Sequence, residues 1–143
     1  MRRYIVVAHK TLGGEHLIDE LHRRREDDPY CTFHLVVPEH HPHFRIGREH
    51  HAPPSAQSTL NEMLERLALM RIGVTGEVGD SDPVDAVGVV LRREPEGAFA
   101  GIILSTLPKR ISRWWMIDVP TKMAALYPDL QLTHVVAKEA LAS

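Results

Sequence analysis

The chain has little of what characterises secreted or membrane-spanning proteins. It contains one cysteine, Cys31, so no disulfide can form within the chain, and we expect a reducing compartment. No apolar run is long enough to cross a bilayer, and the first residues, MRRYIVVAHK, lack the apolar stretch and the cleavage site of a signal peptide. The formal net charge is only −2, which gives no reason to expect nonspecific binding to nucleic acid or membranes. We therefore expect a cytoplasmic protein.

What remains is the composition of an ordinary globular protein. Hydrophobic residues make up 43% and charged residues 25% of the 143 residues. A chain of this length is most simply one domain spanning residues 1–143, and it is long enough to bury a sizeable core. No internal repeat or low-complexity linker divides the sequence.

Short β-branched runs alternate with amphipathic segments along the chain. Strands are expected at residues 3–8, 31–37, 74–79, 100–106 and 130–137. Helices are expected between them at residues 13–27, 55–73, 80–94 and 112–127, the last with a break at Pro120. In the third helix, Asp82 is a candidate N-cap and Pro83 the first helical residue. The second helix has the clearest apolar face, at Leu60, Met63, Leu64 and Leu67.

This β-α-β-α-β-α-β-α-β alternation predicts the fold class. We expect a three-layer α/β protein, in which a doubly wound parallel sheet of five strands has helices on both faces. Such sheets bind ligands outside the carboxyl ends of their strands, where the strand order reverses. The loops that follow the strands are therefore the segments in which to look for a site.

The loop STLPKRISR, residues 105–113, has the clearest binding chemistry. A helix N-terminus presents unpaired N–H groups to an anion, and arginine adds a planar fork that matches phosphate or carboxylate oxygens. The alternative is that Ser112 only caps the helix and the cations are solvated. The candidate hydroxyls and cations of this loop are Ser105, Thr106, Ser112, Lys109, Arg110 and Arg113.

The loop after the first strand, AHKTLGG, faces the same crevice if strands one and four are neighbours. Lys10 and Thr11 could then contact a ligand, and the glycine pair permits a tight turn and a close approach. The alternative is that the two glycines only start the helix. The candidate ligand-binding set also includes Ala8, His9 and Val37.

The chain resembles the universal stress protein family over nearly its whole length. The resemblance rests on the strand–helix order, on VTGEVGDSDPVDAV after the second helix and on GIILST…SRWWMIDVPTKMA before the last strand. It implies the strand order 3-2-1-4-5, commonly with dimerisation through the fifth strand. Many family members bind ATP between the ends of strands one and four, so the resemblance implies ATP, AMP or another phosphorylated small molecule as the ligand.

The glycine motif with which family members bind nucleotides is missing. Binding members carry G-x-x-G, a spacer of nine residues and then G-[S/T], and these glycines let backbone N–H groups approach the phosphates. The corresponding stretch here reads STLPKRISRWWMID. Ser105 falls at the first glycine, Leu107 or Pro108 at the second, and Ile117 and Asp118 at the closing pair. The chain therefore resembles a divergent member of the family.

Two charges also depart from the family pattern. Asp118 stands where the family holds phosphate, and two unit charges about 4 Å apart repel by roughly 4 kcal/mol at an effective dielectric constant of 20. Its alternative role is to cap the short helix that begins near Pro120. The strand-one acidic residue of nucleotide binders is replaced by the pair His9 and Lys10. Both departures count against ATP in the usual pose of the family.

Three functions remain open at this point. The first is a non-catalytic binding module with a degenerate nucleotide or anion site between strands one and four. The second is a weak nucleotide hydrolase of the same fold that uses Lys109, Arg110 and a histidine. The third is a metal-binding protein that uses a His-rich loop. Because the chain has no G-x-S-x-G motif and no recognisable general base with an oriented partner, we assign no catalytic residue.

The segment EHHPHFRIGREHH, residues 39–51, is rich in histidine. A zinc site needs three or four ligands held by a rigid frame. The segment has no periodic apolar anchor, and adjacent histidines rarely point at one ion. We therefore assign no metal site and interpret the segment as a solvated loop. Its histidines are His40, His41, His43, His50 and His51.

Replacing these five histidines by serine or asparagine is expected to leave thermal stability nearly unchanged. Surface substitutions away from specific contacts usually change the free energy of unfolding by less than about 0.5 kcal/mol. Calorimetric melting of both proteins checks this expectation. Stoichiometric zinc in freshly purified, untagged wild type that is lost in the variant would instead establish a metal site.

A homodimer formed through the last strand, residues 130–137, is also expected. An apolar strand left at the edge of a sheet invites uncontrolled association, so it should be covered or paired. Light scattering at roughly tens of micromolar protein tests this expectation, because a specific dimer with a micromolar dissociation constant is populated there. A monomer at that concentration would argue against the dimer.

Overall fold

The structure is a computed structural model that describes residues 2–8, 14–39, 55–106 and 118–136. Strands and helices alternate in the predicted order. The strands are β1 (Arg3–Ala8), β2 (Thr32–Pro38), β3 (Val74–Gly79), β4 (Gly101–Thr106) and β5 (Gln131–Val136). The helices are α1 (Glu15–Asp27), α2 (Ala56–Leu69), α3 (Pro83–Arg93) and α4 (Val119–Leu126).

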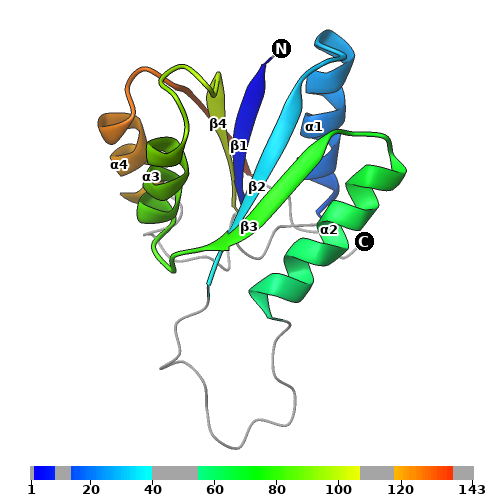
Figure 1. Ribbon diagram of the computed structural model, residues 1–143, viewed down its shortest axis with the longest axis horizontal. Helices are drawn as coiled ribbons and strands as arrows, with labels where there is room; N and C mark the ends of the chain where they lie inside the picture. The colour runs from blue at the N-terminus through cyan, green and yellow to red at the C-terminus, as the bar shows by residue number, and fades with distance from the viewer. Residues whose placement is uncertain (1, 9–13, 40–54, 107–117, 137–143) are drawn as a thin grey trace, which may run out of the picture.

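The strands form one five-stranded sheet in the order β3-β2-β1-β4-β5 (Figure 1). All four neighbouring pairs are parallel. The chain extends the sheet from β1 through β2 to β3 on one side, and then crosses back so that β4 pairs with the other side of β1. The predicted three-layer α/β fold and the strand order 3-2-1-4-5 are therefore confirmed.

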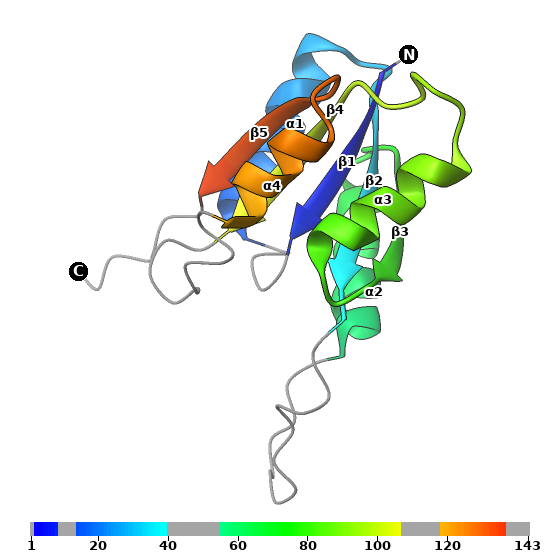
Figure 2. The same ribbon diagram turned by 90° about the vertical axis from the view of Figure 1, so that its left-hand side faces the viewer.

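The helices divide between the two faces of the sheet. α1 and α2 cover one face, whereas α3 and α4 cover the other (Figures 1 and 2). Side chains alternate between these faces along each strand. In β1, Tyr4, Val6 and Ala8 belong to the core under α1 and α2, and Ile5 and Val7 belong to the core under α3 and α4. β1 is buried from both sides, which explains its continuous apolar sequence.

The predicted apolar face of α2 packs against the core as expected. In α2, Leu60, Met63 and Leu67 are buried, and Leu64 is half-buried against the same core. The side chain of Ser55 caps this helix by accepting a hydrogen bond from the N–H of Ser58 at 3.0 Å. None of the described helices is long and apolar enough to span a membrane.

The two helices on the other face begin differently. Asp82 caps α3 as predicted, because its side chain accepts a hydrogen bond from the N–H of Val84 at 2.9 Å. Asp118 precedes α4 but makes no capping hydrogen bond, since its backbone is already helical and not extended as an N-cap residue is. The expected capping role of Asp118 is therefore wrong. Pro120 lies in the first turn of α4, where its missing N–H costs no intrahelical bond. The expected helical residues 112–117 lie outside the described residues, so the break at Pro120 stays a prediction.

β3 and β5 are the outer strands of the sheet. In β5, Val136 is 38% exposed, whereas Leu132 and Val135 are half-buried. Arg24 of α1 reaches this strand and donates a hydrogen bond to Oγ1 of Thr133 at 2.7 Å. The pairing of two copies through β5 stays a prediction.

Candidate functional site

The strand order reverses between β1 and β4, at the centre of the sheet. Ala8 at the end of β1 is opposite Ser105 near the end of β4. Strands one and four are thus neighbours, as the predicted crevice requires. In open α/β sheets the ligand site lies at such a reversal, outside the carboxyl ends of the strands.

The described residues at this reversal are buried. Ala8 and Ser105 are completely buried, and Val37 is 4% exposed. Val37 lies at the same end of the sheet because Val36 pairs with Val7. Among the described residues, no buried side-chain nitrogen or oxygen lacks a hydrogen-bond partner. The hydroxyl of Ser105 is therefore not an unmet group that a ligand would have to satisfy.

The other members of the predicted set follow β1 and β4 in the sequence. Thr106 is the last residue of β4. Seven of the expected ligand-binding residues lie outside the described residues, as do the five histidines of residues 40–51. These seven are His9, Lys10, Thr11, Lys109, Arg110, Ser112 and Arg113.

The described residues at the carboxyl end of the sheet carry negative charge. Glu39 follows β2, Asp80 follows β3 and Asp118 precedes α4, and all three side chains are exposed. Asp80 also accepts a hydrogen bond from the N–H of Asp82 at 2.9 Å, which orders the turn before α3. An anion at this end would therefore have to be held by the cations of the loops after β1 and β4, against repulsion from these carboxylates.

Comparison with protein-family models and with curated proteins finds no match for the chain. The assignment of the candidate site is therefore supported only by its position in the sheet and by the chemistry of its residues.

A second polar arrangement, which no motif in the sequence indicates, lies on the α3 side of β2 and β3. Nε2 of His34 is 2.7 Å from Oε1 of Glu77, and Nδ1 of His34 is 2.7 Å from Oγ1 of Thr75. Arg93 of α3 donates to the same oxygen of Glu77. The side chain of His34 is only 13% exposed. We call these four residues the His34 cluster.

The His34 cluster has the order carboxylate, imidazole and hydroxyl. In the tautomer in which Nε2 donates to Glu77, Nδ1 accepts a hydrogen bond from the hydroxyl of Thr75, and this order of groups also occurs in hydrolytic triads. The cluster lies away from the reversal, however, because His34 pairs with Ile5 in the middle of the sheet. Arg93 also shares the carboxylate oxygen that orients His34. We interpret the cluster as structural, because its hydrogen bonds join the outer strand β3 to β2 and to α3.

Other candidate chemistry is limited in the described part of the chain. No group of three or more His, Cys, Asp or Glu residues there could hold a metal ion. Cys31 is 2% exposed, and burial raises the pKa of its thiol, so it stays protonated at neutral pH. Cys31 is a small member of the core under α1 and α2.

Glu77→Gln is expected to destabilise the protein in a pH-dependent way. Partial burial alone would raise the pKa of the Glu77 carboxyl, but hydrogen bonds from Arg93 and His34 outweigh it and hold this pKa below its ordinary value. Such a carboxylate stabilises the fold above the unfolded pKa of about 4.3, and the stabilisation is lost as the pH falls through the lower, folded pKa. Urea unfolding should therefore show the largest difference between wild type and variant near neutral pH, and a shrinking difference in acid.

Glu62→Gln is the matched control, because Glu62 is exposed on α2 and forms no ion pair with another described residue. It is expected to change the free energy of unfolding by less than about 0.5 kcal/mol at each pH. An effect of Glu77→Gln that stays constant from neutral to acidic pH would contradict a stabilising role of the charge.

Proposed function

We propose that the chain is a universal stress protein-like, non-catalytic binding module that holds a phosphorylated small molecule at the carboxyl ends of β1 and β4. The observation that carries this proposal is the pairing of Ala8 with Ser105 at the reversal of an all-parallel sheet. In the sequence, Lys10 follows β1 and Arg110 and Arg113 follow β4, so these cations come after neighbouring strand ends. A role in stress response, a cytoplasmic location and a homodimer through β5 belong to the same proposal.

The charges at this end favour a small anion over a polyphosphate tail. Asp118 is exposed and makes no cap, so its carboxylate has no role in starting α4. Asp80 and Glu39 add negative charge at the ends of the neighbouring strands. Together with the missing glycines, these carboxylates support a monophosphate such as AMP, or inorganic phosphate, over ATP in the usual pose of the family.

The alternative functions receive less support. A nucleotide hydrolase would need its base beside the bound phosphate, whereas His34 lies in the middle of β2 and is held by Glu77. The His-rich segment of the metal-binding hypothesis lies outside the described residues. No observation therefore favours either function over the binding module.

Calorimetric titration with ATP, AMP and phosphate at low salt tests the proposal. Wild type is expected to bind AMP or phosphate and to bind ATP poorly. Asp118→Ser should improve ATP affinity, by about tenfold for each 1.4 kcal/mol of repulsion relieved. The double variant Arg110→Ala/Arg113→Ala should lose anion binding, and with it the sensitivity of binding to salt.

Two control variants separate local contacts from changes of net charge. Arg2→Ala/Arg71→Ala removes two exposed arginines at the amino-terminal end of the sheet, and Asp19→Ser removes an exposed carboxylate of α1. Both controls are expected to bind like wild type. Submicromolar ATP binding by wild type would show that the glycine motif is dispensable, and absence of anion binding in every protein would reject the proposal.

A further inference from the structure

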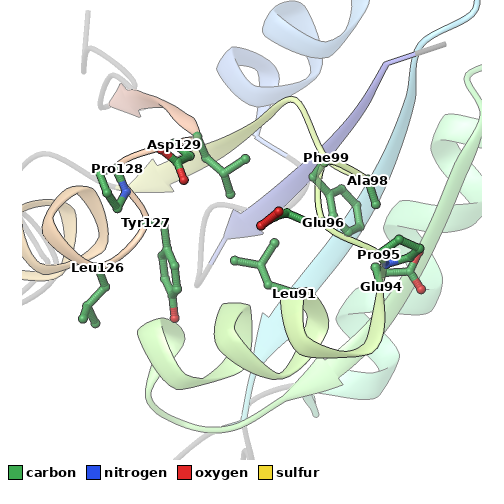
Figure 3. A pocket seen from close by; sticks show the side chains of 12 residues that line it. Leu91, Glu94, Pro95, Glu96, Ala98, Phe99, Leu126, Tyr127, Pro128 and Asp129 are labelled. Atoms are coloured by element: carbon green, nitrogen blue, oxygen red, sulfur yellow. The ribbon is translucent and has the colours of Figure 1, made fainter.

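A groove of about 330 Å³ opens at the amino-terminal end of the sheet, opposite the end at which we propose anion binding. We call it the amino-end groove, and it is lined by Leu91, residues 94–99 and residues 126–130. Figure 3 shows its two sides, with Tyr127 and Asp129 facing Glu96 and Phe99 across the opening. Its volume lies at the lower end of the range for small-molecule sites.

The walls of the groove are apolar and held in place. Phe99 is 4% exposed, and the guanidinium carbon of Arg3 lies over its ring, 4.5 Å from the ring centroid. The hydroxyl of Tyr127 donates to the backbone carbonyl of Val84 at 3.0 Å, which fixes the second aromatic wall. Leu91 of α3 lies between the two rings (Figure 3). A preformed apolar wall of this kind binds without first having to be ordered.

The polar groups of the groove carry negative charge. Glu94 is neutralised by Arg3, whose Nη1 lies 2.7 Å from its carboxylate. Glu96 and Asp129 are exposed, and neither forms an ion pair with another described residue. Burial raises the pKa of the Tyr127 hydroxyl, so this group is neutral at physiological pH. None of the lining residues is cationic.

The helix ends add to this negative charge. α3 and α4 both end at the groove, and the carbonyl end of a helix carries a partial negative charge. The last turn of α3 is balanced by Arg92 and Arg93, whereas the last turn of α4 contains no basic residue. The end of α4 and the carboxylates of Glu96 and Asp129 therefore favour a cation in the groove.

We propose that the amino-end groove binds a small organic amine. Its aromatic or branched aliphatic body would lie against Leu91, Phe99 and Tyr127, with the protonated nitrogen near Glu96 and Asp129. An ammonium group has three N–H donors and no acceptor, which suits a pair of carboxylates. This site is independent of the proposed function, because it uses other residues at the other end of the sheet.

Methyl NMR of the full chain with two matched probes tests the proposal. The probes are 2-phenylethylamine, which is a cation at neutral pH, and 2-phenylethanol, which has the same shape without the charge. The amine is expected to shift the methyl signals of Leu91, Leu126 and Leu130, which line the groove. Because exposed ion pairs are modest in strength, we expect it to bind about fivefold more tightly than the alcohol at low salt. High salt should remove this difference.

The double variant Glu96→Gln/Asp129→Asn should reduce amine affinity to that of the alcohol, and leave alcohol affinity unchanged. The control Glu62→Gln/Asp19→Asn makes the same charge change on exposed surfaces of α2 and α1 and should bind like wild type. Equal binding of the two probes by wild type, or shifts confined to residues outside the groove, would overturn the proposal. It would also be overturned if the groove signals shifted with protein concentration in the absence of a probe, because a second copy would then occupy the groove.

Discussion

The parallel pairing of β1 with β4 is the constraint on which the rest of the structure depends. β1 has a strand on each side and helices over each face, so every side chain from Ile5 to Ala8 is completely buried. The chain reaches β4 only after it has placed β2 and β3 on the other side of β1, and right-handed crossovers then put α3 and α4 on the face opposite α1 and α2. The same crossing creates two separate cores and the reversal of strand order at which the loops after β1 and β4 begin. The backbones of β4 and β5 also approach closely. A Cβ atom on Gly101 would lie 2.7 Å from the carbonyl oxygen of Gln131 in β5, so this approach requires glycine.

Because the centre of the sheet is buried, ligands can bind only at its two ends. These ends differ electrostatically. At the carboxyl end, helix N-termini favour anions, but Asp80, Asp82 and Asp118 oppose this preference. At the amino end, arginines balance the C-termini of α1, α2 and α3, whereas the C-terminus of α4 has the same sign as the nearby carboxylates of Glu96 and Asp129. An anion site therefore depends on added cations such as Arg110, whereas a cation site in the amino-end groove can use the carbonyl end of α4.

The alternation of strands and helices could be predicted because each element carries a local signal, such as the β-branched run of β1 or the helical spacing of Leu60, Met63 and Leu67. The position of Asp82 as a cap could be predicted for the same reason. The His34 cluster and the amino-end groove could not, because they join segments that are distant in the sequence. Thr75 and Glu77 share one face of β3 by alternation, yet only the register between β2 and β3 brings His34 between them. The residues did not by themselves determine that strands one and four are neighbours, and the order came from the resemblance to a family.

The outer strands are held by a different kind of interaction from the centre. β1 is fixed by burial, which depends little on pH or moderate salt. β3 is held in part by the hydrogen bonds and charges of the His34 cluster, and β5 by Arg24, which also lies 4.9 Å from the ring centroid of Tyr4. Protonation of Glu77 weakens the first of these attachments. Arg24 is itself held by Glu20, at 2.7 Å. Burial alone would raise the pKa of the Glu20 carboxyl, but hydrogen bonds from Arg23 and Arg24 outweigh it and hold this pKa below its ordinary value. Both outer strands therefore depend in part on an ionised carboxylate, so acid should loosen the edges of the sheet before it affects the reversal between β1 and β4.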